Sequence, residues 1–315
     1  MIEIQNLTKQ YGQIKAVNNL NFTVEKGEIL GFLGPNGAGK TTTMNIITGY
    51  IPSTEGTVRV CGYDILESPK EVKKRIGYLP EQPPVYMDMT VIDYLNFVAD
   101  LKKVDKKQKR SQISDIMELV KIGDHRNRLI KNLSKGYKQR VGLAQSLVGS
   151  PDVLILDEPT VGLDPKQIIE IRKLIKALGK EHTIILSSHI LPEVSAVCER
   201  IVIINKGEIA AIDTPENLSK GLGSASKLTA TIAGPRNSVE NAIRGIYGVK
   251  YVEAASEKDN EAISYVIESD KEVDIRKPLF FAMAKLGHPI IELKSLNLSL
   301  EDIFLQIVTQ EKEVV

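Results

Sequence analysis

A short segment of the chain, Gly34 to Thr41, combines glycine, lysine and threonine at a spacing suited to binding phosphate. It reads Gly-Pro-Asn-Gly-Ala-Gly-Lys-Thr and matches the pattern G-x-x-x-x-G-K-T. Glycine has no Cβ atom, so the backbone can approach an anion closely and turn successive N–H groups toward it. The ammonium group of Lys40 can meet the outer phosphates of a nucleotide, and the Thr41 hydroxyl is a hard oxygen ligand suited to Mg²⁺.

The sequence on either side of this segment predicts a strand before it and a helix after it. Residues 29–33 form an apolar run that suits a buried strand, and residues 42–48 lack Gly and Pro and can open a helix. In this context the pattern is expected to bind phosphate, aided by the helix dipole. The expected nucleotide-binding residues are Gly34, Pro35, Asn36, Gly37, Ala38, Gly39, Lys40, Thr41 and Thr42.

Two further apolar runs of strand length end in residues that can do chemistry. Residues 153–156 are followed by Asp157 and Glu158, and residues 183–186 lead through two serines to His189. A carboxylate at such a strand end can hold Mg²⁺, and its neighbour can orient an attacking water. We expect these strands to belong to one sheet.

Two loops carry additional polar candidates. Gln82 lies within residues 80–84, where three prolines exclude regular structure. Residues 133–137, Leu-Ser-Lys-Gly-Tyr, precede a helix that we expect to begin near Gln139. Ser134 and the N–H groups at the start of that helix are suited to meeting phosphate.

Composition restricts the class of protein. The chain has 315 residues, enough for about two domains. Lys and Arg number 41 against 40 Asp and Glu, so no overall charge attracts nucleic acid. Two cysteines without metal-type spacing fit a reducing compartment. The N-terminus lacks the features of a signal peptide, and no run approaches 18 apolar residues, so we expect no membrane span of its own.

The order of the expected elements predicts an α/β fold in two parts. Residues 1–220 predict an N-terminal antiparallel β subdomain, a mostly parallel core sheet and a helical insert at about 84–145. A Gly- and Ser-rich linker is expected at 221–227. Residues 228–315 follow the β-α-β-β-α-β order of a small ferredoxin-like α+β domain, with a last helix at 300–310. We expect this part to be an accessory domain that regulates the protein or supports a dimer.

Taken together, these motifs resemble the nucleotide-binding subunit of an ABC transporter, a P-loop NTPase, over residues 1 to about 220. Their order in the chain matches that of the family: an aromatic loop at Tyr11, Walker A at 34–42, the Q-loop at Gln82, the signature at 133–140, Walker B at Val153–Asp157, the D-loop at Gly162-Leu163-Asp164 and the switch histidine His189. Residues 77–82 and the C-terminal extension look most like exporter-type ATPases of the ABC-2 class.

The resemblance implies roles for residues on both sides of a head-to-tail dimer. The catalytic set is Glu158, which polarises the water, His189, which holds the γ-phosphate, and Gln82. Mg²⁺ would be surrounded by Thr41, Gln82 and Asp157, Tyr11 would stack on adenine, Lys40 would bind the β- and γ-phosphates, and Ser134, Gly136 and the D-loop Asp164 would act in trans.

The resemblance also implies partners. One is a second copy of the chain or a homologous ATPase subunit, and another is a separate membrane permease, which would hold this chain at the inner face of the cell membrane, on the cytoplasmic side. Hydrolysis of Mg-ATP would then drive translocation of a substrate, most simply its export. The surface near residues 82–93 and the helical insert would receive the permease.

The chain departs from the family consensus in two motifs, and two other functions stay open. Lys135 and Tyr137 replace a glycine and the glutamine of Leu-Ser-Gly-Gly-Gln, and Val161-Gly162 stands where the D-loop usually has Ser-Ala. A soluble ABC-type ATPase acting on a nucleic-acid or ribosomal machine is one alternative, although such relatives carry two cassettes, coiled coils or basic tails. A GTPase is the other, because residues 205–208 partly match a base-reading N-K-x-D motif.

Overall fold

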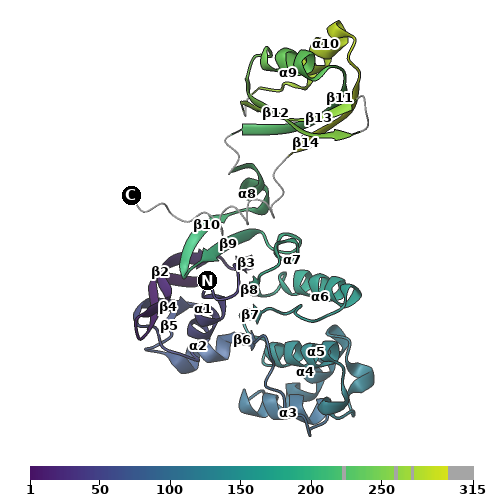
Figure 1. The fold of residues 1–315 in the computed structure, drawn as a ribbon. Coiled ribbons are helices and arrows are strands. Elements are labelled where there is room, and N and C mark those ends of the chain that lie inside the picture. The colour runs from purple at the N-terminus through teal and green to yellow at the C-terminus, as the bar shows by residue number, and fades with distance from the viewer. Residues whose placement is uncertain (222–224, 259–261, 271–272, 297–315) are drawn as a thin grey trace. The chain divides into compact units, whose positions relative to one another are not determined.

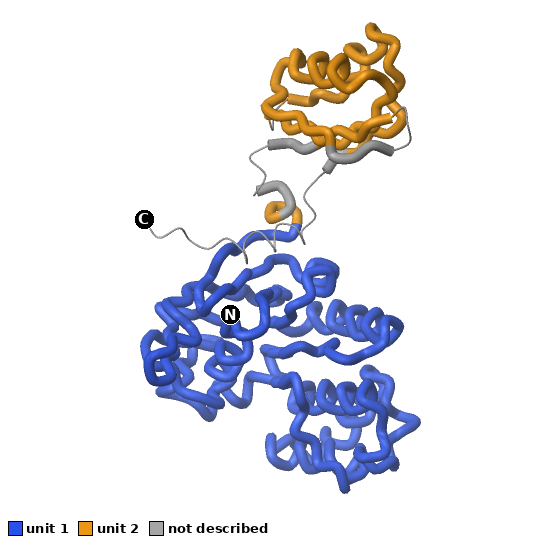
Figure 2. The backbone as a smooth tube through the Cα atoms, viewed as in Figure 1, with its two compact units in different colours: residues 1–215 blue, residues 216–315 orange. Residues whose placement is uncertain are grey.

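The computed structural model of the chain describes residues 1–221, 225–258, 262–270 and 273–296. The chain divides into two compact units, Met1–Pro215 and Glu216–Val315 (Figure 2). The division comes a few residues before position 220, where we expected the nucleotide-binding part to end. It falls at the start of a short helix, α8 (Pro215–Gly221), which Thr214-Pro215 had predicted.

The larger unit is built around a sheet in the order β10-β9-β3-β8-β7-β6 (Figure 1). The strands are β3 (Ile29–Leu33), β6 (Ile76–Leu79), β7 (Val153–Asp157), β8 (Thr183–Ser188), β9 (Arg200–Asn205) and β10 (Glu208–Asp213). Neighbours from β9 to β6 are parallel, and only β10 pairs antiparallel. Every residue of β3, β7 and β8 is buried, as expected for parallel strands that are covered on both faces.

Two helices show how the sequence sets the ends of elements in this unit. Helix α6 (Pro165–Leu178) has the predicted bounds, because Asp164 accepts a hydrogen bond from Gln167 N at 2.9 Å and Pro165 occupies the first turn. Helix α1 (Lys40–Ile47) begins two residues before the expected Thr42. A short helix α2 (Pro69–Arg75) and α7 (Leu191–Ser195) complete the α/β part.

A second, antiparallel sheet forms the predicted N-terminal β subdomain. Its order is β2-β1-β4-β5, with β1 (Ile2–Tyr11), β2 (Ile14–Val24), β4 (Glu55–Val60) and β5 (Tyr63–Asp64). The alternation of Ile2 and Ile4 with polar residues places both isoleucines in a core that also contains Phe32 of β3 and Met44 of α1. The two sheets therefore share one hydrophobic core, with the phosphate-binding segment at its edge.

The helical insert contains α3 (Val91–Leu101), α4 (Lys106–Leu119) and α5 (Lys135–Leu147), with short 3₁₀ turns Gly123–His125 and Ile130–Asn132 before α5. One face of α4, formed by Ile113, Ile116 and Met117, is buried as its periodicity predicted. The expected start of α5 near Gln139 is wrong. Ser134 caps the helix by accepting a hydrogen bond from Tyr137 N at 3.4 Å, and α5 therefore begins at Lys135.

The smaller unit has the predicted ferredoxin-like topology. Its elements are β11 (Ala225–Ala233), α9 (Arg236–Arg244), β12 (Val249–Lys258), β13 (Ala262–Asp270), α10 (Arg276–Leu286) and β14 (Ile290–Leu296). The strands pair antiparallel in the order β12-β13-β11-β14. Strand β11 begins inside the segment 221–227 that we expected to be a linker, and the helix predicted at 300–310 lies outside the described residues.

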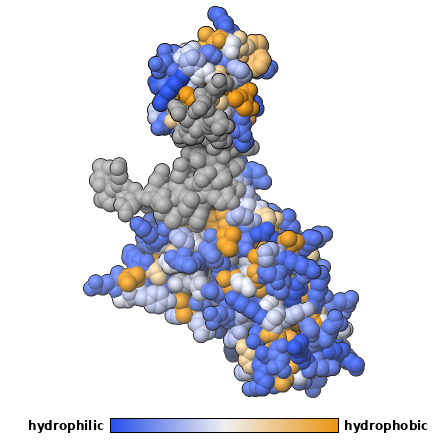
Figure 3. Space-filling model, turned by 45° about the vertical axis from the view of Figure 1, so that its right-hand side comes forward, coloured by the Kyte–Doolittle hydropathy of each residue, from blue (hydrophilic) through white to orange (hydrophobic). Residues whose placement is uncertain are grey.

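One face of the molecule can be described by its hydropathy. On the face in Figure 3, hydrophilic residues predominate and hydrophobic ones form small separate patches. In the part of the chain that the structure describes, no helix has the length and apolarity needed to cross a membrane.

Candidate active site

The phosphate-binding segment follows β3 and leads into α1, and its glycines are required by its geometry. Gly37 and Gly39 have φ angles of +80° and +106°, which L side chains rarely adopt. A Cβ atom at Gly39 would lie 2.5 Å from the carbonyl oxygen of Ala16, and one at Gly34 would lie 2.8 Å from Cγ2 of Ile204. The loop therefore folds back against strands β2 and β9 with its backbone, leaving no room for side chains at these two positions.

Lys40, the first residue of α1, turns its ammonium group back over the loop. Its Nζ donates hydrogen bonds to the carbonyl oxygens of Gly34 at 2.8 Å and Pro35 at 3.3 Å. The same atom lies 3.6 Å from Oε1 of Glu158, and both side chains are more than nine-tenths buried. Because a buried ammonium group needs anionic or carbonyl partners, this position is one where phosphate oxygens could take their place.

Glu158 and His189 come from the carboxyl ends of the neighbouring strands β7 and β8 and meet there. Nδ1 of His189 lies 3.0 Å from both carboxylate oxygens of Glu158. Glu158 has a φ angle of +48°, a conformation that costs a non-glycine residue free energy. Such strain at a buried carboxylate, held between a lysine and a histidine, is typical of a functional site.

Asp157, which ends β7, has one carboxylate oxygen engaged and one free to bind. Oδ1 accepts a hydrogen bond from Ser187 Oγ, whereas Oδ2 is buried and has no hydrogen-bond partner. Burial raises the pKa of Asp157, and the neighbouring hydroxyl groups of Ser187 and Thr41 oppose that change. An unpartnered buried carboxylate oxygen beside a threonine hydroxyl fits a Mg²⁺ ion, which is held by few protein ligands and by the substrate's phosphates.

Gln82 lines a cavity of about 640 Å³, to which Lys40, Glu158 and His189 do not contribute. Thr41, Gln82 and Asp157, the three predicted Mg²⁺ ligands, all contribute to its lining. Tyr78 of β6 also lines it and donates a hydrogen bond to Asn45 Oδ1 at 3.1 Å, and burial raises the pKa of Tyr78. The structure therefore brings the Q-loop candidate to the same hollow as the ends of β6 and β7.

Tyr11 is half exposed at the end of β1, directly before the turn at Gly12. The ammonium group of Lys9 lies 5.2 Å from the centre of its ring. Tyr11 pairs with Ile14 across the hairpin, and the next part of β2 reaches the phosphate-binding loop at Ala16. An exposed ring at this edge of the loop is suited to stacking on a base.

The signature and D-loop residues lie against each other within the same chain. A Cβ atom at Gly136 would lie 2.8 Å from Cδ of Gln167 in α6, so the start of α5 packs closely on the helix that follows the D-loop. Asp164 caps that helix. Among the described residues, no hydrogen bond joins Ser134 or Gly136 to the phosphate-binding loop of the same chain.

A hydrogen-bond network behind the site was missed at the sequence level. The Ser187 hydroxyl accepts from Glu158 N at 3.0 Å and donates to Asp157. Buried Glu193 of α7 accepts from Thr160, just before the D-loop, and from Ser188 Oγ at 3.4 Å, just before His189. The only signal was the Ser187-Ser188 pair beside His189, which we had treated as a connection.

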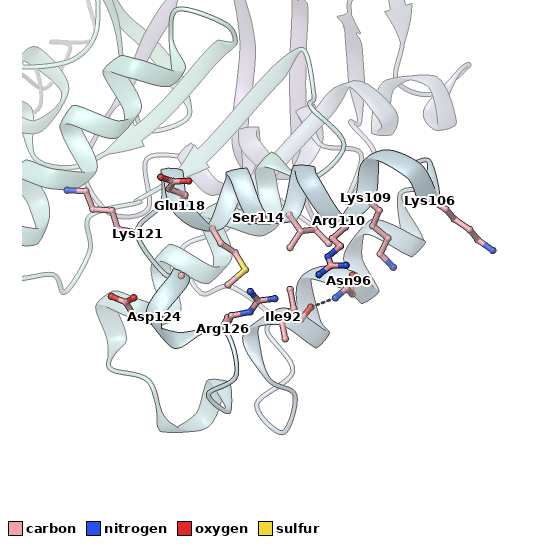
Figure 4. Close-up of a pocket in the computed structure, with 13 residues that line it drawn as sticks. Ile92, Asn96, Lys106, Lys109, Arg110, Ser114, Glu118, Lys121, Asp124 and Arg126 are labelled. Carbon is pink, nitrogen blue, oxygen red and sulfur yellow. Dashed lines mark hydrogen bonds between the residues drawn. The ribbon is translucent and has the colours of Figure 1, made fainter.

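A larger hollow, of about 860 Å³, lies in the helical insert and is separate from these residues. It is lined by α3, α4 and the segment that follows, and Arg110 and Arg126 extend into it (Figure 4). No residue of the phosphate-binding loop, β7 or β8 contributes to its lining.

Comparison with known proteins places this geometry among ATP-binding cassettes. Residues 17–161 match the model of the ABC transporter family. The linearmycin resistance ATP-binding protein LnrL of Bacillus subtilis is 34% identical over 80% of this chain and 81% of its own. The bacitracin transport ATP-binding protein BcrA of Bacillus licheniformis is 41% identical over 66% of this chain and 68% of its own. The lantibiotic transport ATP-binding protein SrtF of Streptococcus pyogenes is 40% identical over 70% of this chain and 95% of its own.

Solved structures agree with the sequence comparison. An ATP-binding subunit of an ABC transporter superposes with a TM-score of 0.65 at 26% identity, covering 70% of this chain and 92% of its own. The dimeric ATP-binding cassette MJ0796, in a post-hydrolysis state bound to ADP and Pi, gives a TM-score of 0.63 at 25% identity and covers 68% and 98%. Both matches cover most of the solved chain.

Proposed function

The chain belongs to the ABC transporter family as one of its ATP-binding subunits, and from this premise we propose how its residues divide the work of hydrolysis. As a subunit of this kind it binds ATP, hydrolyses it and dimerises, and the sequence alternatives of a nucleic-acid machine or a GTPase are not favoured. The observation that carries the residue roles is the meeting of three side chains: Lys40 from the start of α1, and Glu158 and His189 from the ends of the neighbouring parallel strands β7 and β8.

In the proposed site, Glu158 is the general base that orients and deprotonates the attacking water. Its carboxylate lies next to Lys40, which would bind the β- and γ-phosphates, and next to His189, which would hold the γ-phosphate in line with that water. Tyr11 would stack on the adenine. Mg²⁺ would be held by Thr41, Gln82 and Asp157, where it would neutralise charge on the phosphates.

We infer that the remaining part of the site comes from a second copy of the chain. Ser134 and Gly136 form no hydrogen bond with the phosphate-binding loop of their own chain among the described residues, and they lie at the start of α5, whose N–H groups suit an anion. A head-to-tail pair would bring them, together with the D-loop Asp164, onto the γ-phosphate held by the partner. ATP would then join the two copies, and its hydrolysis would release them.

The transport partner is proposed to be a separate membrane permease that keeps this chain at the inner face of the membrane. The permease would dock at the cavity beside Gln82 and at the surface of residues 82–93. The loop that contains Gln82 would then contact both the permease and the site of the nucleotide. The relatives are named for bacitracin and lantibiotic transport and for linearmycin resistance. We infer that the permease exports a similar antimicrobial compound, and co-purification of a permease with this chain tests the partnership.

The experiment for the catalytic roles compares two variants with wild type. Glu158→Gln should keep ATP binding, lower kcat by about 10²- to 10⁴-fold through loss of the base, and accumulate an ATP-bound dimer. Lys40→Ala should instead lose affinity for ATP. ATPase assays, calorimetry and sedimentation at several protein concentrations separate these effects.

A control and a contradicting result complete this test. Glu199→Gln changes one carboxylate outside the proposed site and should leave turnover unchanged. Wild-type turnover by Glu158→Gln would refute the base assignment, and turnover per subunit that is independent of protein concentration in an isolated monomer would refute the shared site.

A further inference from the structure

Lys135 of the signature and Gly162 of the D-loop lie in direct contact within one chain. A Cβ atom at Gly162 would lie 2.7 Å from Cε and 3.1 Å from Cδ of Lys135, and closer still to Nζ. Gly162 has a φ angle of +69°, so the D-loop backbone turns there without a side chain. The lysine side chain therefore extends from the start of α5 across the D-loop backbone at Gly162, and its ammonium group lies against that backbone.

The charge of Lys135 is unusual for its place in the helix. It is the first residue of α5, where the partial positive charge of the helix favours an acidic residue, and the first turn of α5 contains none. Among the residues that the structure describes, no carboxylate forms an ion pair with Lys135. A cation that is added to the positive end of a helix and left unpaired is favourable where an anion from outside the chain approaches.

We propose that Lys135 supplies an additional cation to the triphosphate bound by the partner subunit, and that Gly162 positions it. This inference rests on the proposed head-to-tail dimer, in which Ser134 and Gly136, on either side of Lys135, face that triphosphate. In the same proposed dimer the D-loop Asp164 faces the partner, so an ammonium group held beside Gly162 would lie toward that neighbour. Because ADP lacks the γ-phosphate charge, the contribution of Lys135 favours the ATP-bound dimer over the ADP-bound one.

The test uses Glu158→Gln as background, because hydrolysis then does not deplete the dimer. Lys135→Met keeps an unbranched side chain without charge, and Lys135→Arg keeps the charge. Lys173→Met is the matched control, since Lys173 is an exposed lysine of α6 away from the signature. Sedimentation equilibrium with ATP or ADP at low and at high salt gives the dimer dissociation constant of each variant.

Lys135→Met should raise the dimer dissociation constant with ATP by about tenfold, which corresponds to about 1.4 kcal/mol, and should reduce its dependence on salt. Lys135→Arg should restore most of the affinity, and Lys173→Met should change neither quantity. A side chain that only fills space beside Gly162 would be replaced well by methionine, so the salt dependence separates a charge from a packing role.

Gly162→Ala tests the positioning. It should weaken the dimer when lysine is present at 135 and weaken it much less when methionine is present, so the two changes should not add in a double-mutant cycle. The backbone strain of alanine at positive φ is common to both arms and cancels in the cycle.

Two outcomes separate this inference from the function on which it rests. If Glu158→Gln forms an ATP-dependent dimer that Lys135→Met leaves equally tight and equally salt-dependent, the role of Lys135 is refuted and the proposed function stands. If Glu158→Gln forms no ATP-dependent dimer, the shared site is refuted and the inference falls with it.

Discussion

Lys102 offers a quantitative test of the packing inside the helical insert. In the sequence it opens a basic run at residues 102–107, a composition typical of a solvated connection. The structure instead turns its ammonium group inward, where Nζ donates a hydrogen bond to the carbonyl oxygen of Val148 at 2.8 Å. Burial lowers the pKa of Lys102 from 10.5 to about 8. The residue thereby ties the end of α3 to the end of α5, next to the cavity of Gln82.

The size and sign of the effect on stability follow from this pKa. Each unit of pKa shift corresponds to about 1.36 kcal/mol, and partial exposure of the side chain to solvent reduces the effect to about 1–2 kcal/mol in total. The folded state disfavours the charged form, so between about pH 8 and 10.5 the unfolded chain binds the proton that the folded chain has lost. The free energy of unfolding should therefore rise through this range. Below pH 8 the folded state should bear the whole cost of burying the charged lysine.

The assay compares wild type with Lys102→Met at pH 7.5 and 9.5. The free energy of unfolding of wild type, measured with urea, should rise by about 1–2 kcal/mol more than that of the variant between the two pH values, because the two proteins share all other titrating groups. Lys107→Met removes an exposed lysine of the same run and should follow wild type. Titration of ¹³Cε-labelled lysines by NMR should place one resonance near pH 8. Parallel stability profiles for wild type and Lys102→Met, or titration of Lys102 near 10.5, would refute the burial argument.

Three further changes test other parts of the molecule. Asp157→Asn should abolish the gain in ATP affinity on adding Mg²⁺ over EDTA, measured by calorimetry, and a gain of wild-type size would remove Asp157 from the metal site. Ser134→Ala should destabilise the start of α5 by about 1 kcal/mol through loss of its cap, seen as faster amide exchange there, and unchanged exchange would contradict the capping role. Tyr265→Phe removes a buried hydroxyl that has no hydrogen-bond partner. The free energy of unfolding of the smaller unit, measured by calorimetry, should therefore stay the same or rise by up to about 1 kcal/mol. The exposed Tyr247→Phe is its control, and destabilisation above 1 kcal/mol would show that the Tyr265 hydroxyl has a partner.

The parts of the fold that depend on local sequence were predicted well. Helix α6 has the expected bounds because its cap, Asp164-Pro165, and its apolar periodicity lie within the helix itself. The strand β7 was predicted because four apolar residues precede two acids. The β-α-β-β-α-β order likewise gave the topology of the smaller unit, since short connections leave few ways to arrange such elements.

The misplaced boundaries have particular physical causes. α5 begins at Lys135 because the Ser134 hydroxyl caps it, whereas we had expected the helix to begin near Gln139. β11 begins at Ala225 because the backbone pairs with β13 and β14, and such long-range pairing is not visible in a Gly- and Ser-rich segment. The inward turn of Lys102 was missed for a similar reason, because its partner Val148 is distant in sequence.

The site residues were recognised from motifs, but their pairing required the fold. In the half-site that would bind nucleotide, the ammonium group of Lys40, at the start of α1, lies against the Glu158 carboxylate, and His189 contacts the same carboxylate. In the half-site that would act in trans, Lys135 adds to the positive end of α5, and no acid in its first turn balances it. In the proposed dimer, a triphosphate would disturb the first set and neutralise the second, so the free energy of binding would be largest when both half-sites share it. This asymmetry would give two copies a physical reason to bind ATP between them, and the dimer, not the single chain, would then sense the γ-phosphate.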